Sequence, residues 1–239
     1  MATRIFIGTS PNRYDAEIEV IYEYSLRKHC ESEIDINWMR LTNDKNNFWS
    51  DWRTKKWFTP FSGFRWGIPE FCDFNGRVIY TDVDMINLRD ISKLLEVNMQ
   101  GKPFAARKGA RWGFELCVMV IDCDRAKDHI WKANKLKSKA NSHQFHRDYI
   151  SSSNLVHEVD KRWNCLDGED MPIEEMYQLH FTNMSTQPWH PQWYKGKKLI
   201  HPRKDILELY KQFKEEAINN PIVSQSKMKS EFVNFEISL

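Results

Sequence analysis

The chain has 239 residues, 41% hydrophobic and 28% charged, as is usual for a globular protein with a substantial core. Lys and Arg number 35 against 33 Asp and Glu, so charge gives no case for a nucleic-acid partner. No apolar run is long enough to span a membrane, and the first residues lack a signal-peptide pattern. Five scattered cysteines indicate free thiols in a reducing compartment, so we expect a cytoplasmic protein.

The first elements alternate between strand and helix. Residues 4–9 form a short apolar run closed by Gly, Thr, Ser and Pro, which predicts a buried strand and then a loop. Helical spacing of apolar residues predicts a helix over 14–28, and an alternating pattern predicts a strand over 34–38. A helix over 68–74 is expected to stop at Gly76. The next run, RVIYTDVD, predicts a third strand that ends in two carboxylates.

The second half continues the alternation. We expect a short helix over 91–97, a strand over 104–106 and a buried strand over 117–121. Residues 134–147 are polar and basic, which favours a helix end and a loop, and an amphipathic helix is predicted from 205 to about 217. The pattern predicts an α/β domain over 1–218 with a largely parallel sheet, whose ligands bind at the carboxyl ends of the strands. We treat 219–239 as a tail or the start of a further segment.

Aromatic residues are abundant between the second and third predicted strands. The chain contains 10 Trp, 14 Phe and 8 Tyr. The group in this region consists of Phe48, Trp49, Trp52, Trp57, Phe58, Phe61, Phe64 and Trp66. Core packing is the simpler interpretation, and a cleft on which sugars stack is the alternative.

The two carboxylates of RVIYTDVD are Asp82 and Asp84, which point to the same side of an extended segment because side chains alternate. Two ionised carboxylates so close repel each other unless a cation lies between them, and Mg²⁺ and Mn²⁺ prefer oxygen ligands. A turn followed by a helix cap would use the same residues. Asp122 and Asp124 repeat the spacing after another apolar strand, so the pattern alone leaves both interpretations open.

Three segments together carry a resemblance to a known family. The strand ending in DVD before MINLRDISKL, the early RIFIGTSPNRY and the late HFTNMSTQPWHP resemble the family 8 retaining glycosyltransferases, which include glycogenin and bacterial galactosyltransferases. The resemblance covers residues 4 to about 194. It implies the GT-A fold, in which helices flank a mostly parallel, Rossmann-like central sheet. It also implies that a D-x-D motif and a later His hold Mn²⁺, or Mg²⁺, against a nucleotide-diphosphate sugar.

The resemblance assigns roles to particular residues. It implies metal ligation by Asp82, Asp84 and His180, and an imidazole ligand suits Mn²⁺ better than Mg²⁺. The residues that it implies for binding the nucleotide sugar are Gly8, Thr9, Ser10, Tyr14, Arg65, Asp82, Val83, Glu115 and Gln187. Asp148 is the nearest carboxylate by spacing to the acceptor-side Asp of the family, and we take it as the catalytic candidate.

The sequence departs from the family at two of these positions. Glu115-Leu116-Cys117 stands where relatives carry Asn-Ser-Gly or Asn-Ala-Gly against the donor sugar, so the sugar is not identified. Gln187 stands where relatives carry a phosphate-binding Lys. A lysine among residues 195–198 could supply that positive charge from a closing loop.

The expected function is sugar transfer from a nucleotide-diphosphate sugar, with a UDP-sugar as the first candidate donor, to a hydroxyl acceptor such as a glycan, with retention of configuration. An inverting GT-A transferase, which needs a general-base carboxylate, is the first alternative. A nucleotidyltransferase and a non-catalytic carbohydrate-binding module are the others.

Overall fold

The structure is a computed structural model that describes residues 2–110, 113–190 and 194–220. The described chain divides into two compact units, each assembled from segments that are far apart in the sequence. The first unit contains residues 2–11, 32–82 and 92–161, and the second contains residues 12–31, 83–91 and 162–220. Most of the tail expected over 219–239 lies outside the described residues. No helix of the described segments is long and apolar enough to cross a membrane.

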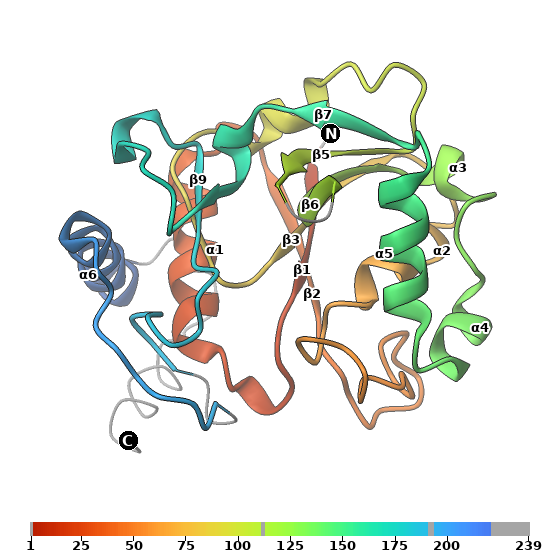
Figure 1. The fold of residues 1–239 in the computed structure, drawn as a ribbon, viewed down its shortest axis with the longest axis horizontal. Helices are drawn as coiled ribbons and strands as arrows, with labels where there is room; N and C mark the ends of the chain where they lie inside the picture. The colour runs from red at the N-terminus through yellow and green to blue at the C-terminus, as the bar shows by residue number, and fades with distance from the viewer. Residues whose placement is uncertain (1, 111–112, 191–193, 221–239) are drawn as a thin grey trace. The chain divides into compact units, whose positions relative to one another are not determined.

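The first unit contains a six-stranded sheet (Figure 1). Its strands are β1 (Thr3–Gly8), β2 (Ile34–Met39), β3 (Arg77–Asp82), β5 (Phe104–Gly109), β6 (Gly113–Asp122) and β7 (Val156–Val159). They lie in the order β2-β1-β3-β6-β5-β7, with β6 antiparallel to both of its neighbours and every other pair parallel. The predicted largely parallel sheet is therefore confirmed.

The central strands form because their residues are apolar on both faces of the sheet. Ile5, Phe6 and Ile7 of β1 and Ile79 of β3 are completely buried, as in parallel strands covered on both sides. The chain passes from β1 outward to β2 and then returns to β3 on the other side of β1. The strand order thus reverses between β1 and β3, and open α/β sheets bind ligands at such a point.

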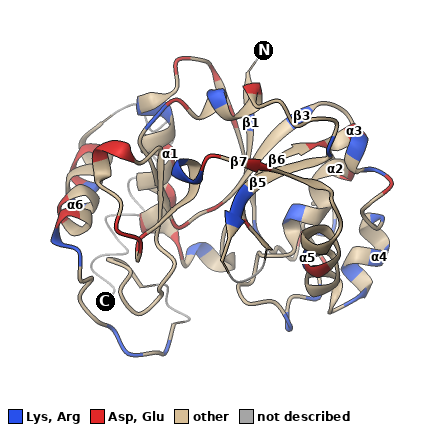
Figure 2. Cartoon of the chain, turned by 45° about the horizontal axis from the view of Figure 1, so that its top comes forward, with Lys and Arg blue, Asp and Glu red and all other residues tan. Residues whose placement is uncertain are grey.

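Four short helices belong to the first unit, and Figure 1 shows them grouped beside its sheet. They are α2 (Ile68–Phe71), α3 (Cys123–Ala126), α4 (Ala133–Ser138) and α5 (Ser142–Ser152), and a 3-10 helix, η2 (Phe64–Gly67), precedes α2. The helix expected over 68–74 is shorter, because Asp73 and Phe74 adopt left-handed φ angles of 51° and 54°. The expected helix end and loop over 134–147 contains most of α4 and half of α5. Figure 2 shows the basic positions of α4, whose Leu136 is buried.

The aromatic group between β2 and β3 packs as core. Trp49, Trp52, Phe64 and Trp66 are all buried and make ring contacts with one another or with neighbouring rings. Phe58 is the exception, with 84% of its surface exposed. The stacking-cleft alternative therefore does not describe most of this group.

The second unit is built around two long helices and a small sheet. The helices are α1 (Ala16–His29) and α6 (Lys204–Asn219), and the sheet joins β4 (Met85–Asn87), β9 (Gln178–His180) and β8 (Cys165–Leu166) in that order. Three short 3-10 helices lie wholly or mostly in this unit, η1 (Pro11–Arg13), η4 (Lys161–Asn164) and η5 (Ile173–Glu175), whereas η3 (Ile91–Glu96) lies mostly in the first unit.

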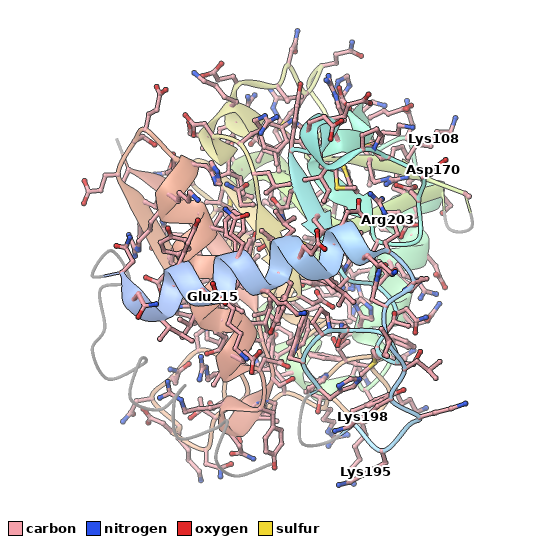
Figure 3. All side chains as sticks on the ribbon, turned by 90° about the vertical axis from the view of Figure 1, so that its left-hand side faces the viewer. Lys108, Asp170, Lys195, Lys198, Arg203 and Glu215 are labelled. Atoms are coloured by element: carbon pink, nitrogen blue, oxygen red, sulfur yellow. The ribbon has the colours of Figure 1, made fainter. Side chains whose placement is uncertain are left out.

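Helix α6 packs across α1 (Figure 3). Helix α1 also packs on β4, so its residues from Ala16 to Leu26 are all buried, including Glu17. The hydroxyl of Tyr210 and the ammonium of Lys214 on α6 both donate to Glu17, the latter over 3.0 Å. The two helices predicted over 14–28 and 205–217 are confirmed.

Candidate active site

The first cluster of predicted site residues lies at the carboxyl edge of the large sheet. Asp82 is the last residue of β3, and Gly8, the last residue of β1, is its partner in the parallel ladder. Arg65 of η2 is buried and donates from Nη2 to Asp82 Oδ1 over 2.9 Å. The structure therefore brings together three residues that are far apart in the sequence, at the point where the strand order reverses.

The Asp82 carboxylate is held by two donors. The Tyr80 hydroxyl also donates to Asp82 Oδ1, and Arg65 lies over the Tyr80 ring at 4.3 Å from its centroid. Burial alone would lower the pKa of Arg65, but Asp82 and the polar groups around it raise this pKa above its ordinary value. Burial raises the pKa of Tyr80 well above its ordinary value, so its hydroxyl keeps the proton that it donates. Asp82 is consequently fixed as an oriented acceptor.

Arg65 is itself fixed by backbone carbonyl groups. Its Nε donates to the Ser62 carbonyl over 2.7 Å, and its Nη1 donates to the Leu116 carbonyl. Three of its N–H groups therefore donate to protein acceptors, and the contact with a nucleotide sugar expected of Arg65 stays a prediction. Its observed action is to orient Asp82.

The loop after β1 is closely packed. A Cβ atom on Gly8 would lie 2.8 Å from Phe61 Cδ2 and 3.0 Å from Tyr80 Oη, so only glycine fits here. Thr9 and Ser10 are completely buried, and the Thr9 amide donates to the Met39 carbonyl over 3.0 Å. Thr9 and Ser10 thus present no exposed surface in this structure, and the contact expected between this loop and a nucleotide stays a prediction.

Strand β6 is irregular beside this cluster. Residues 116–119 of β6 face the single residue Ala106 of β5, because the register shifts between Ala105 and Arg107. The irregular segment supplies the Leu116 carbonyl to Arg65, and Cys117 Sγ lies within 4.8 Å of the Asp82 carboxylate. Half-buried Glu115 stands at the start of this segment. The stretch expected to contact the donor sugar therefore has a locally distorted backbone.

The second cluster, in the second unit, pairs Asp84 with His180. Strands β4 and β9 place them side by side, since Met85 is the ladder partner of His180 and the Phe181 amide donates to the Asp84 carbonyl over 2.9 Å. His180 Nε2 lies 3.4 Å from Asp84 Oδ1, and His180 Nδ1 lies 2.9 Å from Asn164 Oδ1. Sequence reasoning missed Asn164, because only the fold brings η4 to β9.

The chemistry of this pair fits a cation. Because Asn164 Oδ1 is an acceptor, Nδ1 of His180 carries a proton, and in the neutral tautomer Nε2 presents a lone pair to Asp84. Asp84 Oδ1 is buried and receives no hydrogen bond from the described residues. Two acceptor atoms thus face each other, an arrangement that a cation between them would satisfy. A metal-bound His usually donates its other nitrogen to a fixed acceptor, as His180 does.

Gln187 supports Asp84. Its Nε2 donates to the Phe181 carbonyl over 3.0 Å and lies 3.4 Å from Asp84 Oδ2. Val83 is buried, and its carbonyl accepts from the Met85 amide. Gln187 thus contacts Asp84, and the contact with a nucleotide sugar expected of it stays a prediction.

Lysines 195 and 198 lie on an exposed loop of the same unit (Figure 3). The loop is anchored beyond them, because the Leu199 amide donates to the Ser185 carbonyl over 2.7 Å and His201 Nε2 lies 3.2 Å from Asp167 Oδ2. No described contact joins these lysines to Asp84 or His180, and their closure over a ligand stays a prediction.

Two other predicted residues join neither cluster. Tyr14 follows two residues with left-handed φ angles and accepts from Asn12 Nδ2 over 3.5 Å. Asp148 lies on α5 with 57% of its side chain exposed, and its contacts are with Gln144 and Arg147 of the same helix. The catalytic role expected for Asp148 stays a prediction.

His143 is a residue that sequence reasoning missed. It stacks on Trp66, whose Nε1 donates to His143 Nδ1 over 3.1 Å. Burial, together with nearby Arg65 and Arg147, holds the pKa of His143 well below its ordinary value, so the imidazole is neutral. Residues far apart in sequence create this environment, and no motif marks it.

Comparisons with known proteins agree on the fold. No protein-family model matches the sequence, and a search of curated proteins finds no match. The glycosyltransferase GlyE of Streptococcus pneumoniae TIGR4 superposes with a TM-score of 0.63 at 16% identity, over 99% of this chain and 64% of that one. The galactosyltransferase LgtC, solved with donor and acceptor sugar analogs, gives 0.61 at 13% identity over 90% and 95%.

The bifunctional glycosyltransferase WbbM superposes with a TM-score of 0.59 at 12% identity, over 98% of this chain and 51% of that one. The chain thus spans between half and two thirds of the length of WbbM and GlyE. At these identities the likeness establishes the architecture, which is that of GT-A glycosyltransferases.

Proposed function

We propose that this protein is a metal-dependent glycosyltransferase that moves a sugar from a nucleotide-diphosphate sugar, first of all a UDP-sugar, to a hydroxyl acceptor. The observation that carries the proposal is the buried Asp84 oxygen that faces His180 Nε2 without a hydrogen bond, on a GT-A fold. The LgtC structure with donor and acceptor sugar analogs supports this substrate class by analogy.

The proposed ligands of the cation are Asp82, Asp84 and His180. Asp82 and Asp84 are separated by one residue, and each is held by its own neighbours within its own unit. One imidazole with two carboxylates suits Mn²⁺ better than Mg²⁺, although both accept oxygen ligands. A bound divalent ion supplies neutralisation of the diphosphate and of the charge on the departing nucleotide.

The protein's own groups prepare this site. Arg65 and Tyr80 hold the Asp82 carboxylate in one orientation, and Asn164 keeps the His180 proton on Nδ1. Gln187 occupies the second oxygen of Asp84. Within each unit these supports are in place before ligands bind, so each of the two clusters is oriented in advance.

We assign the nucleotide to the loop after β1 and the donor sugar to the irregular segment of β6. Gly8, Thr9 and Ser10 form a tightly packed loop at the carboxyl edge, and Val83 directly follows Asp82. Glu115, which replaces the family's asparagine, is a hydrogen-bond acceptor for sugar hydroxyl groups. Tyr14 would contact the base or ribose, by the resemblance described above.

Retention of configuration is a further part of the proposal, with attack on the same face of the sugar as the departing group. Asp148 is exposed and bound to Arg147, so it is a weak candidate for a nucleophile or base in the state described. Product stereochemistry measured by NMR separates this route from inversion, which requires a general-base carboxylate.

The proposal is tested by a thermal-shift screen of nucleotide sugars with and without Mn²⁺, followed by measurement of released nucleoside diphosphate. A UDP-sugar should stabilise the protein more with Mn²⁺ than without it, because specific binding stabilises by mass action. Electron paramagnetic resonance of Mn²⁺ measures binding of the ion without requiring turnover. Release of pyrophosphate would instead identify a nucleotidyltransferase, and sugar binding that survives EDTA without nucleotide release would identify a binding module.

A further inference from the structure

His143 of helix α5 lies close to the first cluster of the candidate site, within the first unit. Its Nδ1 accepts a hydrogen bond from Trp66 Nε1 over 3.1 Å, and the two rings stack with their centroids 6.1 Å apart. Trp66 directly follows Arg65, which donates to Asp82 over 2.9 Å. Arg65 also donates to the Leu116 carbonyl in the irregular segment of β6, and its charge is near enough to lower the pKa of His143. His143 is therefore a neighbour of the segment that we assign to the donor sugar.

The half-buried imidazole of His143 presents one N–H group to its surroundings. Burial, with Arg65 and Arg147 nearby, holds its pKa well below the ordinary value, so the ring is neutral. An indole N–H can only donate, so Nδ1 is the acceptor of the Trp66 contact and the single ring proton is on Nε2. No hydrogen bond among the described residues uses Nε2, and this atom is not enclosed by protein. Trp66 thus fixes the tautomer of a neutral donor that a ligand can reach.

A second N–H group without an acceptor belongs to the ring beside His143. The Trp57 ring lies 6.2 Å from the His143 ring between centroids, and Trp57 is 8% exposed. Trp57 Nε1 is enclosed and has no hydrogen bond within the part of the chain that the structure describes. The indole packs directly over Gly63, where no room remains for a Cβ atom, so its position is fixed. A buried donor of this kind usually has a partner, and here the described protein supplies none.

We infer that His143 is a substrate-binding residue, which donates from Nε2 to the oxygen of a sugar hydroxyl group. A neutral donor suits a hydroxyl oxygen, whereas phosphate and carboxylate groups are bound more strongly by charged donors. A site that donates to a particular hydroxyl group also rejects sugars that lack it, so His143 contributes to specificity. The inference rests on the proposed function for the sugar as substrate. The hydroxyl group belongs either to the transferred sugar or to the acceptor, and the experiment distinguishes these two sources.

Two substitutions separate this role from simple support of Trp66. His143→Asn can place its side-chain oxygen where Nδ1 accepts from Trp66, but it has no atom at the position of Nε2. His143→Gln can place an amide N–H near the position of Nε2, but it supports Trp66 less well. A sugar-binding role predicts weaker sugar binding in His143→Asn and partial rescue in His143→Gln. A purely structural role predicts the opposite order, with His143→Asn closer to the unsubstituted protein in sugar binding as well as in urea denaturation.

The test titrates the whole chain with UDP, UDP-glucose and UDP-galactose in the presence of Mn²⁺, and with methyl glucoside and methyl galactoside. Loss of one hydrogen bond should weaken binding of the preferred sugar roughly three- to tenfold in His143→Asn and leave binding of UDP unchanged. His157→Asn makes the same change at a half-buried histidine of β7 and should bind all probes normally. A loss confined to UDP-sugars assigns the contact to the transferred sugar, and a loss confined to methyl glycosides assigns it to the acceptor.

Nitrogen NMR of the histidine rings gives a second reading that does not depend on affinity. The His143 signals, identified by their absence in His143→Asn, should show the proton on Nε2 and should shift when the preferred sugar is added. Equal sugar binding by His143→Asn and the unsubstituted protein, or no shift of His143 Nε2 with any probe, would overturn the inference. Failure of the proposed function appears separately, as the absence of Mn²⁺-dependent binding of UDP and UDP-sugars to the unsubstituted protein, while the methyl glycosides still report on His143.

Discussion

Replacing Asp84 by asparagine should make the metal-free protein more stable. In the present structure Asp84 Oδ1 and His180 Nε2 are two acceptors 3.4 Å apart, and Asp84 Oδ1 has no hydrogen bond. An asparagine at this position can place its amide nitrogen toward His180 and keep its oxygen toward Gln187, which already donates to the second carboxylate oxygen. The substitution therefore converts an unfavourable contact into a hydrogen bond without a change of shape.

The magnitude follows from this exchange. A new buried hydrogen bond and the loss of an unsatisfied acceptor together amount to about 1–2 kcal/mol. A chain of this length shifts its midpoint by about 2–4 °C per kcal/mol, so the metal-free variant should melt roughly 2–8 °C higher than the unsubstituted protein.

The same substitution should weaken the response to Mn²⁺. At a hundred times its dissociation constant, an ion stabilises the unsubstituted protein by about 2.7 kcal/mol, or roughly 5–11 °C. Asp84→Asn removes a charged ligand and should remove most of this shift at the same Mn²⁺ concentration. The two proteins should therefore exchange their order of stability when Mn²⁺ is added.

The assay is thermal unfolding in EDTA and in Mn²⁺ at about pH 8, where an ordinary imidazole is neutral. Asp35→Asn is the matched control, since Asp35 is half exposed and should respond in neither condition. If Asp84→Asn melts lower than the unsubstituted protein in EDTA and keeps the full Mn²⁺ shift, the argument from facing acceptors is wrong.

Three further substitutions test other parts of the site. Arg65→Met leaves a buried carboxylate without its cation and should lower the free energy of unfolding by about 3–5 kcal/mol in urea denaturation, with Arg65→Lys intermediate; a loss under about 1 kcal/mol would contradict the role given to Arg65. Gly8→Ala places a Cβ 2.8 Å from Phe61 and should lower stability by about 1–3 kcal/mol, whereas Gly168→Ala, with nothing within 4 Å, should change it little. Burial and nearby arginines lower the pKa of His143, so the unfolded chain binds a proton there more readily than the folded chain does. The contribution of neutral His143 to the free energy of unfolding should therefore be complete above the ordinary His pKa of 6.5 and should decrease as the pH drops below it. His143→Gln should flatten that pH dependence of the urea midpoint, and an unchanged slope would assign it to other groups.

The large sheet could be predicted from the sequence because its signal is local. Continuous apolar runs mark β1, β3 and β6, and their alternation with helices predicts the parallel arrangement. The predicted helix lengths were less accurate where left-handed φ angles end a helix. This occurs at Asp73 and Phe74, which end α2 early. Helices α4 and α5 were not predicted in full because their segment is mostly polar. Short amphipathic helices bury few residues, so their apolar spacing gives a weak signal. The division into two units has no composition signal, since each unit collects segments from several places in the chain.

The candidate site was predictable only where a motif lies within one segment. Asp82 and Asp84 follow a strand, and Tyr80 could have been added because residues two apart share a face of a strand. The contact of Asn164 with His180 depends on how η4 meets β9, which no local pattern encodes. The commitment of Arg65 to the Leu116 carbonyl likewise depends on the irregular register of β6.

The packing of α1 against α6 has a consequence for biosynthesis. Glu17 of α1 is satisfied by Tyr210 and Lys214, which are 193 and 197 residues further along the chain. At about 5–20 residues per second, a ribosome needs roughly 10–40 s to make that intervening stretch. Throughout this interval the early helix has apolar side chains and a carboxylate whose eventual cover does not yet exist. The nascent chain must therefore keep one of its first helices from misassociating until nearly the last described residue has been made.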